Sequence, residues 1–427
     1  MSNVYPSSQA ELARFYREHL ETSLLPFWLT RAIDHEHGGV FTCIENSTGK
    51  RVSDDKFVWS QGRFAWLMAH AADMVRRGLL SGDADEYIDI AKKTADFILK
   101  HGYTDDGHAI FLLTADGQKK ETKPGDGYDI SYFVDCFAII GLSGVASVTG
   151  DASYAEAALR NYDDVKRRLA DGSARTEPYP MPPGCKTHST PMIMLNVSET
   201  LERALFDVDH PRRDSVGQDA LGYMDELLDT FMLPSGLIQE AICECDNRLL
   251  TTHVNPGHTV ESMWFLLEQA GRYGRQDAIE AARKVIKATL TVGWDEEYGG
   301  IMRYVMPDGT SPVGPSESAS EDLILDTWHT KIWWPHSEAL YTTALAGLLT
   351  DDEELWQWHE KIWQYTFDTF PNPDPSIGEW INIRDRQGNP IEKVVGLPVK
   401  DPFHIIRNLM LLVEVLDDGV ERRAGPL

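Results

Sequence analysis

Two titratable side chains stand three residues apart where a turn leads into an apolar helix. His258 and Glu261 follow Pro256 and Gly257, which are typical turn residues, and the apolar positions after them recur at helical spacing. Both lie on one helix face and in the first helical turn, where backbone N–H groups lack partners and the helix dipole favours negative charge. This placement suits proton transfer near neutral pH, with a solvated surface pair as the ordinary alternative.

Helical periodicity repeats along the whole chain and gives this pair a context. Apolar residues recur at three- and four-residue spacing, and short runs rich in Gly, Pro and Asp separate the segments. We predict helices over 9–30, 57–77, 84–100, 129–148, 151–170, 190–205, 214–231, 257–273, 276–292, 332–349, 353–370 and 402–416. Strand or hairpin character marks the stretches 37–44, 108–117, 235–252, 294–310 and 377–398.

The twelve predicted helices alternate between two kinds. Every second one is apolar nearly all round, which marks a buried helix, whereas its partner is amphipathic and charged. Six such pairs predict an all-α fold, the (α/α)6 barrel, in which neighbouring repeats bury one another's apolar faces. We expect one domain over residues 1–427, with the short β-hairpin inserts clustered at one end of the barrel.

In a closed ring the inner helices all begin at the same end, so polar residues at their starts face one cavity. Besides His258 and Glu261, the residues at such starts are Arg63, Glu338, His404 and Arg407. The convergence of polar groups on a cavity lined by aromatic residues is what a catalytic site needs. It favours chemistry over a set of unrelated helix caps.

The composition narrows the class of ligand. The net charge is −27, and such a surface repels phosphate backbones and anionic lipids, so we expect neither nucleic acid nor membrane partners. No uninterrupted apolar run approaches the roughly 18 residues of a membrane span. The N-terminus lacks the basic and apolar regions of a signal peptide, and we expect a cytoplasmic protein.

The cysteines indicate neither a disulfide framework nor a metal site. Their odd number, in a large chain, fits a reducing compartment. Cys243 and Cys245 could bind a metal, but no second Cys/His pair at suitable spacing accompanies them, so we predict no metal. The five cysteines are Cys43, Cys136, Cys185, Cys243 and Cys245.

Seven stretches, in order along nearly the whole chain, resemble the N-acylglucosamine 2-epimerase (renin-binding protein) family, which is related to cellobiose and mannose 2-epimerases and to aldose–ketose isomerases. The two most specific are Asn255-Pro-Gly-His-Thr-Val-Glu261 and Lys331-Ile-Trp-Trp-Pro-His-Ser-Glu338. The others are His37-Gly-Gly-Val-Phe-Thr-Cys43, Asp54-Asp-Lys-Phe-Val-Trp-Ser-Gln-Gly-Arg63, Thr190-Pro-Met-Ile-Met-Leu195, Gly378-Glu-Trp380 and Pro402-Phe-His-Ile-Ile-Arg407.

The resemblance implies an (α/α)6 barrel that acts on the open-chain form of an aldose, with His258 and His404 as the acid–base pair. It also implies a supporting set of Arg63, Glu261, Glu338 and Arg407. The chemistry agrees, because the proton on C2 of an aldose is weakly acidic and its removal needs a base poised near neutral pH and a stabilised enediolate. Two histidines from different helices could flank the carbon and return the proton to its opposite face.

Further residues bear on how the sugar is held. Trp59 and Trp334 are candidates for stacking on it, together with Trp264, Trp333 and Trp380, although at least half of these rings are expected to be ordinary core. His253 is a candidate residue at the rim of the site.

The resemblance also separates branches of the family. The cellobiose 2-epimerase branch places a further histidine in the sixth helix, where this chain has Asn196, and segment 190–196 looks more like the N-acyl branch. We therefore predict interconversion of N-acyl-D-glucosamine and N-acyl-D-mannosamine. Mannose–glucose 2-epimerisation and aldose–ketose isomerisation share the enediolate and stay as alternatives. The resemblance implies no cofactor for the chemistry, ATP as a potential allosteric activator, and a homodimer.

Two other functions stay open. A glycoside hydrolase on the same barrel would need two carboxylates across a glycosidic bond, for which Glu261, Glu338 and Asp135 are candidates, but it does not require two histidines. A non-enzymatic binding protein would tolerate the loss of His258 and His404 and would expose an apolar patch.

Overall fold

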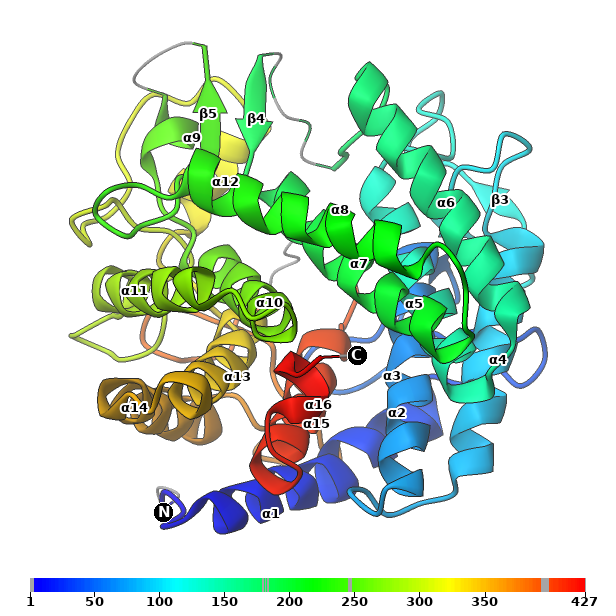
Figure 1. Cartoon of the computed structure of the whole chain (residues 1–427), viewed down its shortest axis with the longest axis horizontal. Helices are drawn as coiled ribbons and strands as arrows, with labels where there is room; N and C mark the ends of the chain where they lie inside the picture. The colour runs from blue at the N-terminus through cyan, green and yellow to red at the C-terminus, as the bar shows by residue number, and fades with distance from the viewer. Residues whose placement is uncertain are drawn as a thin grey trace.

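Two rings of helices, one inside the other, make up the fold. The computed structural model describes residues 4–426 except 179, 181, 183, 245–247 and 393–398. The inner helices are buried along most of their length and are α3 (Val58–Arg76), α5 (Tyr132–Thr149), α7 (Ser189–Asp207), α10 (Pro256–Arg272), α13 (Trp333–Thr350) and α15 (Phe403–Asp417). Each contacts the next, and α15 contacts α3, so the ring closes where the red and blue ends of the chain meet (Figure 1).

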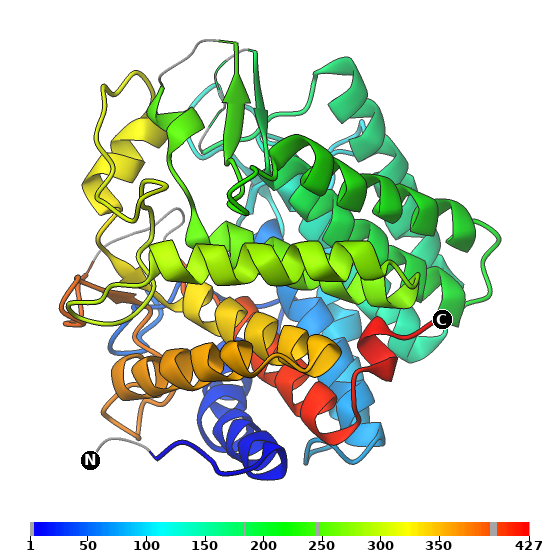
Figure 2. The same ribbon diagram turned by 60° about the vertical axis from the view of Figure 1, so that its left-hand side comes forward.

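The outer helices are amphipathic. All but the first pack on the inner helix that precedes them in the chain, and the first packs on the last inner helix, α15 (Figure 2). They are α1 (Gln9–His19), which runs through the π-helical turn Leu20–Leu24 into α2 (Leu25–Arg31), then α4 (Ala84–His101), α6 (Ala152–Asp171), α8 (Arg213–Glu226) with the π-helical turn Leu227–Phe231, α11 (Gln276–Gly293) and α14 (Glu353–Thr369). The short helices α9 (Leu249–Thr252), α12 (Ala319–Thr327) and α16 (Glu421–Ala424) lie outside this alternation.

The predicted all-α barrel is confirmed, and every predicted helix corresponds to an inner or an outer one. The boundaries move by a few residues for local reasons. The helix predicted over 129–148 begins at Tyr132, because Ser131 is extended and its backbone bridges to Thr176. The single-domain organisation stays a prediction.

Very short strands lie in the inserts, and three of them stand at the starts of inner helices, as predicted for inserts at one end of the barrel. The sheets are β1 (Lys56–Phe57) with β2 (Leu112–Leu113) and β3 (Lys119–Lys120), β4 (Cys185–Thr187) with β5 (Ala241–Cys243), and β6 (Lys331–Ile332) with β7 (Ile383–Arg384), all antiparallel. In the described residues only β2 and β3 form a local hairpin; the other strand pairs join distant inserts.

Short hairpin-like turns are confirmed in several inserts, although single bridges rather than strands hold most of them. Such bridges join Ile44 to Arg51, Trp294 to Ile301 and Arg384 to Pro390. The stretch 235–252 contributes β5 and then turns into α9. The last part of the stretch 377–398 lies outside the described residues.

The prediction that the cysteines form no disulfide was wrong for one pair. Cys185 on β4 and Cys243 on β5 are directly opposite in the ladder and are bonded, although 58 residues separate them in sequence. Strand pairing across two inserts creates this neighbourhood, and residue spacing alone does not reveal it. Cys43 and Cys136 are free and buried, whereas Cys245 lies outside the described residues.

Helix α5 is long and apolar enough to pass for a membrane span by length and composition, although Asp135 interrupts its apolar run. Its mean hydropathy is 1.6, and 72% of it is buried inside the protein. Both values fit its place in the inner ring, where a helix is surrounded by other helices.

Helices α3 and α5 approach each other closely at two glycines. A Cβ atom at Gly62 would lie 2.1 Å from the carbonyl oxygen of Phe137, and one at Gly141 would lie 2.5 Å from the carbonyl oxygen of Gly62. Real Cβ atoms do not approach backbone atoms this closely, so the two helices could not pack as they do with any larger residue at either position.

Gly62→Ala should therefore destabilise the protein by about 1–3 kcal/mol, despite the higher helix propensity of alanine. The matched control is Gly222→Ala in α8, where an added Cβ meets nothing within 4 Å; it should be neutral or stabilise the helix by up to about 1 kcal/mol. Thermal unfolding followed by circular dichroism at one scan rate measures both. Equal melting temperatures for Gly62→Ala and the wild type would contradict the tight contact.

Candidate active site

A cavity of about 390 Å³ lies where the inner helices begin, and most of the predicted site residues line it. These are Trp59, Arg63, Asn196, His258, Glu261, Trp334, His404 and Arg407. Glu338 lies behind the cavity wall and is completely buried. The closed ring thus brings residues from α3, α7, α10, α13 and α15 together at one end of the barrel, as the sequence predicted.

His404 is held by a buried ionic network. Its Nδ1 is 2.6 Å from Oε1 of Glu338, and Arg407 donates through one nitrogen to Glu338 (2.7 Å) and to Glu261 (2.8 Å). Trp264 donates its Nε1–H to the other oxygen of Glu338 at 2.6 Å. Burial works against ionisation of Glu338, but the charges of Arg407 and His404 outweigh it and lower the pKa of this carboxyl.

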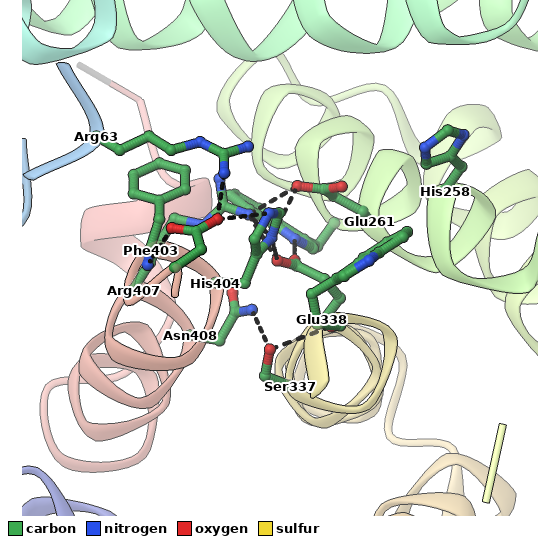
Figure 3. Close-up of polar contacts among 12 residues, drawn as sticks. Arg63, His258, Glu261, Ser337, Glu338, Phe403, His404, Arg407 and Asn408 are labelled. Atoms are coloured by element: carbon green, nitrogen blue, oxygen red, sulfur yellow. Dashed lines mark hydrogen bonds and ion pairs between the residues drawn. The ribbon is translucent and has the colours of Figure 1, made fainter. Parts of the chain in front are cut away.

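This network orients the imidazole of His404. With Nδ1–H donated to Glu338, Nε2 is the nitrogen available for proton transfer. Within the described residues Nε2 has no hydrogen-bond partner, and the nearest carboxylate oxygen, on Asp401, is 3.8 Å away. Figure 3 shows His404, Arg407, Glu261 and Glu338 gathered in this network, whereas the side chain of His258 lies apart from it, although it belongs to the same helix α10 as Glu261.

His258 has its own carboxylate, Glu240, which precedes β5. Nδ1 of His258 is 2.5 Å from Oε1 of Glu240. Burial of the imidazole works against its protonation, but the charge and the hydrogen bond of Glu240 outweigh that effect and raise the pKa of His258. As in His404, the bonded Nδ1 leaves Nε2 available for proton transfer. Asn255 caps the helix at this point by accepting from the backbone N–H of His258.

The indole of Trp334 lies between the two histidines. Its ring centroid is 5.6 Å from that of His258 and 5.6 Å from that of His404, with interplanar angles of 34° and 39°. The two imidazoles therefore tilt over one aromatic surface, and a flat or ring-shaped ligand resting there would meet both.

Arg63 is the cation that faces the cavity from α3. It is ion-paired with Asp401, and its guanidinium lies over the ring of Phe137 at 3.9 Å and next to Trp59 at 4.9 Å. The aromatic rings hold the guanidinium plane in place while its charge remains close to the cavity.

Some predicted residues lie elsewhere. Trp333 lines the cavity, but Trp264 and Trp380 do not and are fully buried core residues. His253, predicted at the rim, lines the cavity but is buried, with Nδ1 3.0 Å from the carbonyl oxygen of Leu249. Asp135 is ion-paired with Arg168 and does not line the cavity.

Sequence reasoning missed Glu240, His188 and Asp401. Asp401 could have been found, because it stands three residues before His404 at a helix start. Glu240 and His188 carried no such signal, since they belong to different inserts and meet only through strand pairing.

Two groups of side chains place potential metal-ligating atoms within 4.8 Å of one another: His188, Glu240 and His258, and Glu261, Glu338 and His404. In each group a carboxylate is hydrogen-bonded to an imidazole nitrogen. Protons therefore account for the close approach of these atoms, and a site without metal stays the prediction.

Comparisons with known proteins identify the family to which this chain is similar. A family model described as N-acylglucosamine 2-epimerase (GlcNAc 2-epimerase) matches residues 39–407. An N-acylglucosamine 2-epimerase of Bos taurus is 29% identical over 97% of this chain and 94% of its own, and a cellobiose 2-epimerase of Ruminococcus albus is 22% identical over 95% and 98%. A solved structure of a D-mannose isomerase superimposes with a TM-score of 0.75 at 16% identity, covering 97% of this chain and all of that one.

Arg407→Met should destabilise the protein by about 3–5 kcal/mol near neutral pH, because it leaves two buried carboxylates without their cation. The sign of the pH dependence follows from Glu338, whose pKa is lowered from its ordinary 4.5 in the folded protein. The stabilisation from the Arg407–Glu338 ion pair is fully present at pH values above that ordinary pKa. It is lost as the pH falls toward the lowered pKa of Glu338 in the folded protein. Unfolding measured across pH should therefore show the largest difference between variant and wild type near neutrality.

The matched control is Arg212→Met, which removes an exposed ion pair with Asp163. It should change the free energy of unfolding by less than about 1 kcal/mol. An equal effect of the two substitutions would mean that Arg407 contributes no more than a surface charge.

Proposed function

The chain belongs to the N-acylglucosamine 2-epimerase family, and we propose that it interconverts N-acyl-D-glucosamine and N-acyl-D-mannosamine by moving the C2 proton of the open-chain sugar. Family membership makes it a carbohydrate 2-epimerase or isomerase. The N-acyl substrate is supported by the relatives that are 26–29% identical over at least 94% of this chain, all named N-acylglucosamine 2-epimerases. Asn196, which stands where the cellobiose 2-epimerase branch places a further histidine, lines the cavity.

The arrangement of His258 and His404 carries this proposal. They come from different inner helices, each has Nδ1 bonded to a carboxylate, and both tilt over the indole of Trp334. Inversion at a carbon needs one group to take the proton from one face and another to supply a proton to the opposite face. Two imidazoles across one aromatic surface meet that requirement.

The proposed reaction needs only groups that this chain supplies. One histidine removes the C2 proton, and the electrons of the C–H bond move toward C1, whose carbonyl oxygen gains negative charge. Arg63, a permanent cation at the cavity, is the proposed stabiliser of that oxygen. The other histidine then protonates C2 from the opposite face. Glu240 and Glu338 keep each imidazole in the required orientation, and Glu240 also favours the protonated form of His258.

A glycoside hydrolase is disfavoured by the state of the carboxylates. Glu338 is buried and engaged by three donors, Glu261 is held by Arg407, and Asp135 lies outside the cavity. A hydrolase needs a protonated acid and a second carboxylate placed across the scissile bond. The observed carboxylates instead serve as partners of cations.

Three expectations accompany the proposal and have their own tests. Activation by ATP would appear as a rise in rate on adding the nucleotide, a homodimer would appear in the mass measured by light scattering, and a cytoplasmic location would appear on cell fractionation. The chemistry itself needs none of the three.

Proton NMR in heavy water tests the reaction directly. N-acetylmannosamine and N-acetylglucosamine should each be converted into the other with deuterium incorporated at C2, because the abstracted proton exchanges with solvent. Mannose and glucose, tested in parallel, distinguish the alternative 2-epimerase, and formation of a ketose identifies an isomerase. Failure of every aldose to take up deuterium would exclude an enediolate mechanism, and release of a reducing end from an oligosaccharide would identify a hydrolase.

Removing one histidine at a time tests the two-base assignment. His258→Asn and His404→Asn should each lower the rate of epimerisation by roughly 10²–10⁴-fold. Each variant should still exchange the C2 proton of one epimer, and the two variants should differ in which epimer exchanges. His35→Asn, at an exposed position, is the matched control and should behave like the wild type. Full epimerase activity in either site variant would refute the assignment.

A further inference from the structure

The carboxylate that holds His258 is itself held from two sides. Oε1 of Glu240 binds His258, and Oε2 is 3.3 Å from Nδ1 of His188. The other ring nitrogen of His188 is 3.0 Å from Oγ of Ser262 on α10. His188 and Ser262 are completely buried, so this chain of contacts ties the carboxylate to the barrel wall behind the cavity.

The backbone brings Glu240 and His188 together through the β4–β5 pair. Glu240 immediately precedes β5, and His188 immediately follows β4. Their positions continue the strand register beyond Thr187 and Ala241, and the N–H of His188 donates to the carbonyl oxygen of Glu240 at 3.0 Å. At the other end of the same short ladder, Cys185 is bonded to Cys243.

A ladder of this length needs a further constraint. The Cys185–Cys243 disulfide, called the clasp below, supplies it. Each strand has three residues, and an isolated two-stranded pair is at best marginally stable in water. The disulfide closes it three residues from both His188 and Glu240. Cross-linking reduces the conformations open to the two inserts and so keeps the carboxylate aligned with the imidazole.

We propose that Glu240 is the positioning residue of His258 and that the disulfide-clasped β4–β5 pair holds it in place, so that proton transfer by His258 depends on the clasp. The inference rests on the proposed catalytic role of His258. Its partner His404 has no such dependence, because Glu338 belongs to the inner helix α13. The dithiol form of the clasp is reached when an added dithiol reductant gives two electrons and two protons to the disulfide and is itself oxidised to a cyclic disulfide.

The pH profile separates a positioning role from a merely structural one. The charged and titratable groups that face His258 are Glu240, Glu261, Arg303, His188 and His253. Burial favours the neutral imidazole and Glu240 provides the largest opposing effect, so the pKa of His258 is raised. Replacing Glu240 by the neutral Gln should lower that pKa and move the low-pH limb of kcat/KM, for the direction in which His258 acts as base, to lower pH.

The first experiment compares Glu240→Gln with the wild type by C2 deuterium exchange across pH. The expected result is a loss of kcat by about 10–100-fold with little change in KM, together with the shifted limb. Glu244→Gln, an exposed carboxylate just beyond β5, is the matched control and should leave both unchanged. Glu240→Asp keeps the negative charge on a shorter side chain. Its low-pH limb should lie closer to that of the wild type than the limb of Glu240→Gln does. An unchanged rate and pH profile in Glu240→Gln would overturn the inference.

The second experiment uses the intact wild-type chain and therefore does not depend on the folding of a variant. After treatment with a dithiol, with reduction verified by mass spectrometry, kcat should fall several-fold and the low-pH limb should shift to lower pH, as in Glu240→Gln.

The double variant Cys185→Ser/Cys243→Ser should show the lowered kcat with or without the dithiol, and Glu240→Gln should lose no further activity on reduction. Complete reduction of the disulfide without a change in kcat would refute the proposed dependence of proton transfer on the clasp. If the wild type itself exchanges no C2 proton, the proposed function fails rather than this inference.

Discussion

The buried guanidinium of Arg407 is the interaction on which the candidate site depends. It lies on α15 and binds Glu261 of α10 and Glu338 of α13, so one cation joins three inner helices. In a medium of low dielectric constant none of these charges is stable without the others. Glu338 also binds His404, and the same ionic contact therefore closes this side of the ring and orients the imidazole of His404. The stability of the ring and the geometry of the candidate site are joined here because the same buried charges serve both.

A second constraint anchors the starts of the inner helices. Lys56, in β1 just before α3, is completely buried and donates to Asp34 and to the carbonyl oxygen of Gly38. Lys331, in β6 just before α13, donates in the same way to Asp295 and to the carbonyl oxygen of Gly299.

In both places an aspartate precedes two consecutive glycines with positive φ, so the same local device occurs twice. Each lysine ties an insert to the helix that follows it. The site residues Arg63 and Glu338 stand seven positions after these lysines, and their helices are thus held at the end where orientation matters.

The parts that could be predicted from the sequence are those encoded by periodicity and closure. The inner helices are apolar all round, and a closed ring requires their first turns to converge, which is why His258, Glu261, His404 and Arg407 could be grouped before any coordinates were known. The disulfide and the pair His188–Glu240 could not be predicted in this way. They depend on strands of three residues whose partners are 58 or fewer residues away along the chain, and such strands carry no periodic signal. Local turns within the inserts could be predicted, whereas the pairing of strands between distant inserts could not.

The two histidines differ in what supports them, and this difference has a physical consequence. His404 takes its carboxylate from α13, so its orientation is as rigid as the packing of the inner ring. His258 takes its carboxylate from an insert outside that ring. A change in the inserts can therefore alter the basicity and position of one imidazole while the other keeps its surroundings. In the proposed reaction, epimerisation needs both groups and the two directions use them in opposite order. Under that proposal, the insert would adjust the balance between removal and return of the proton without disturbing the barrel.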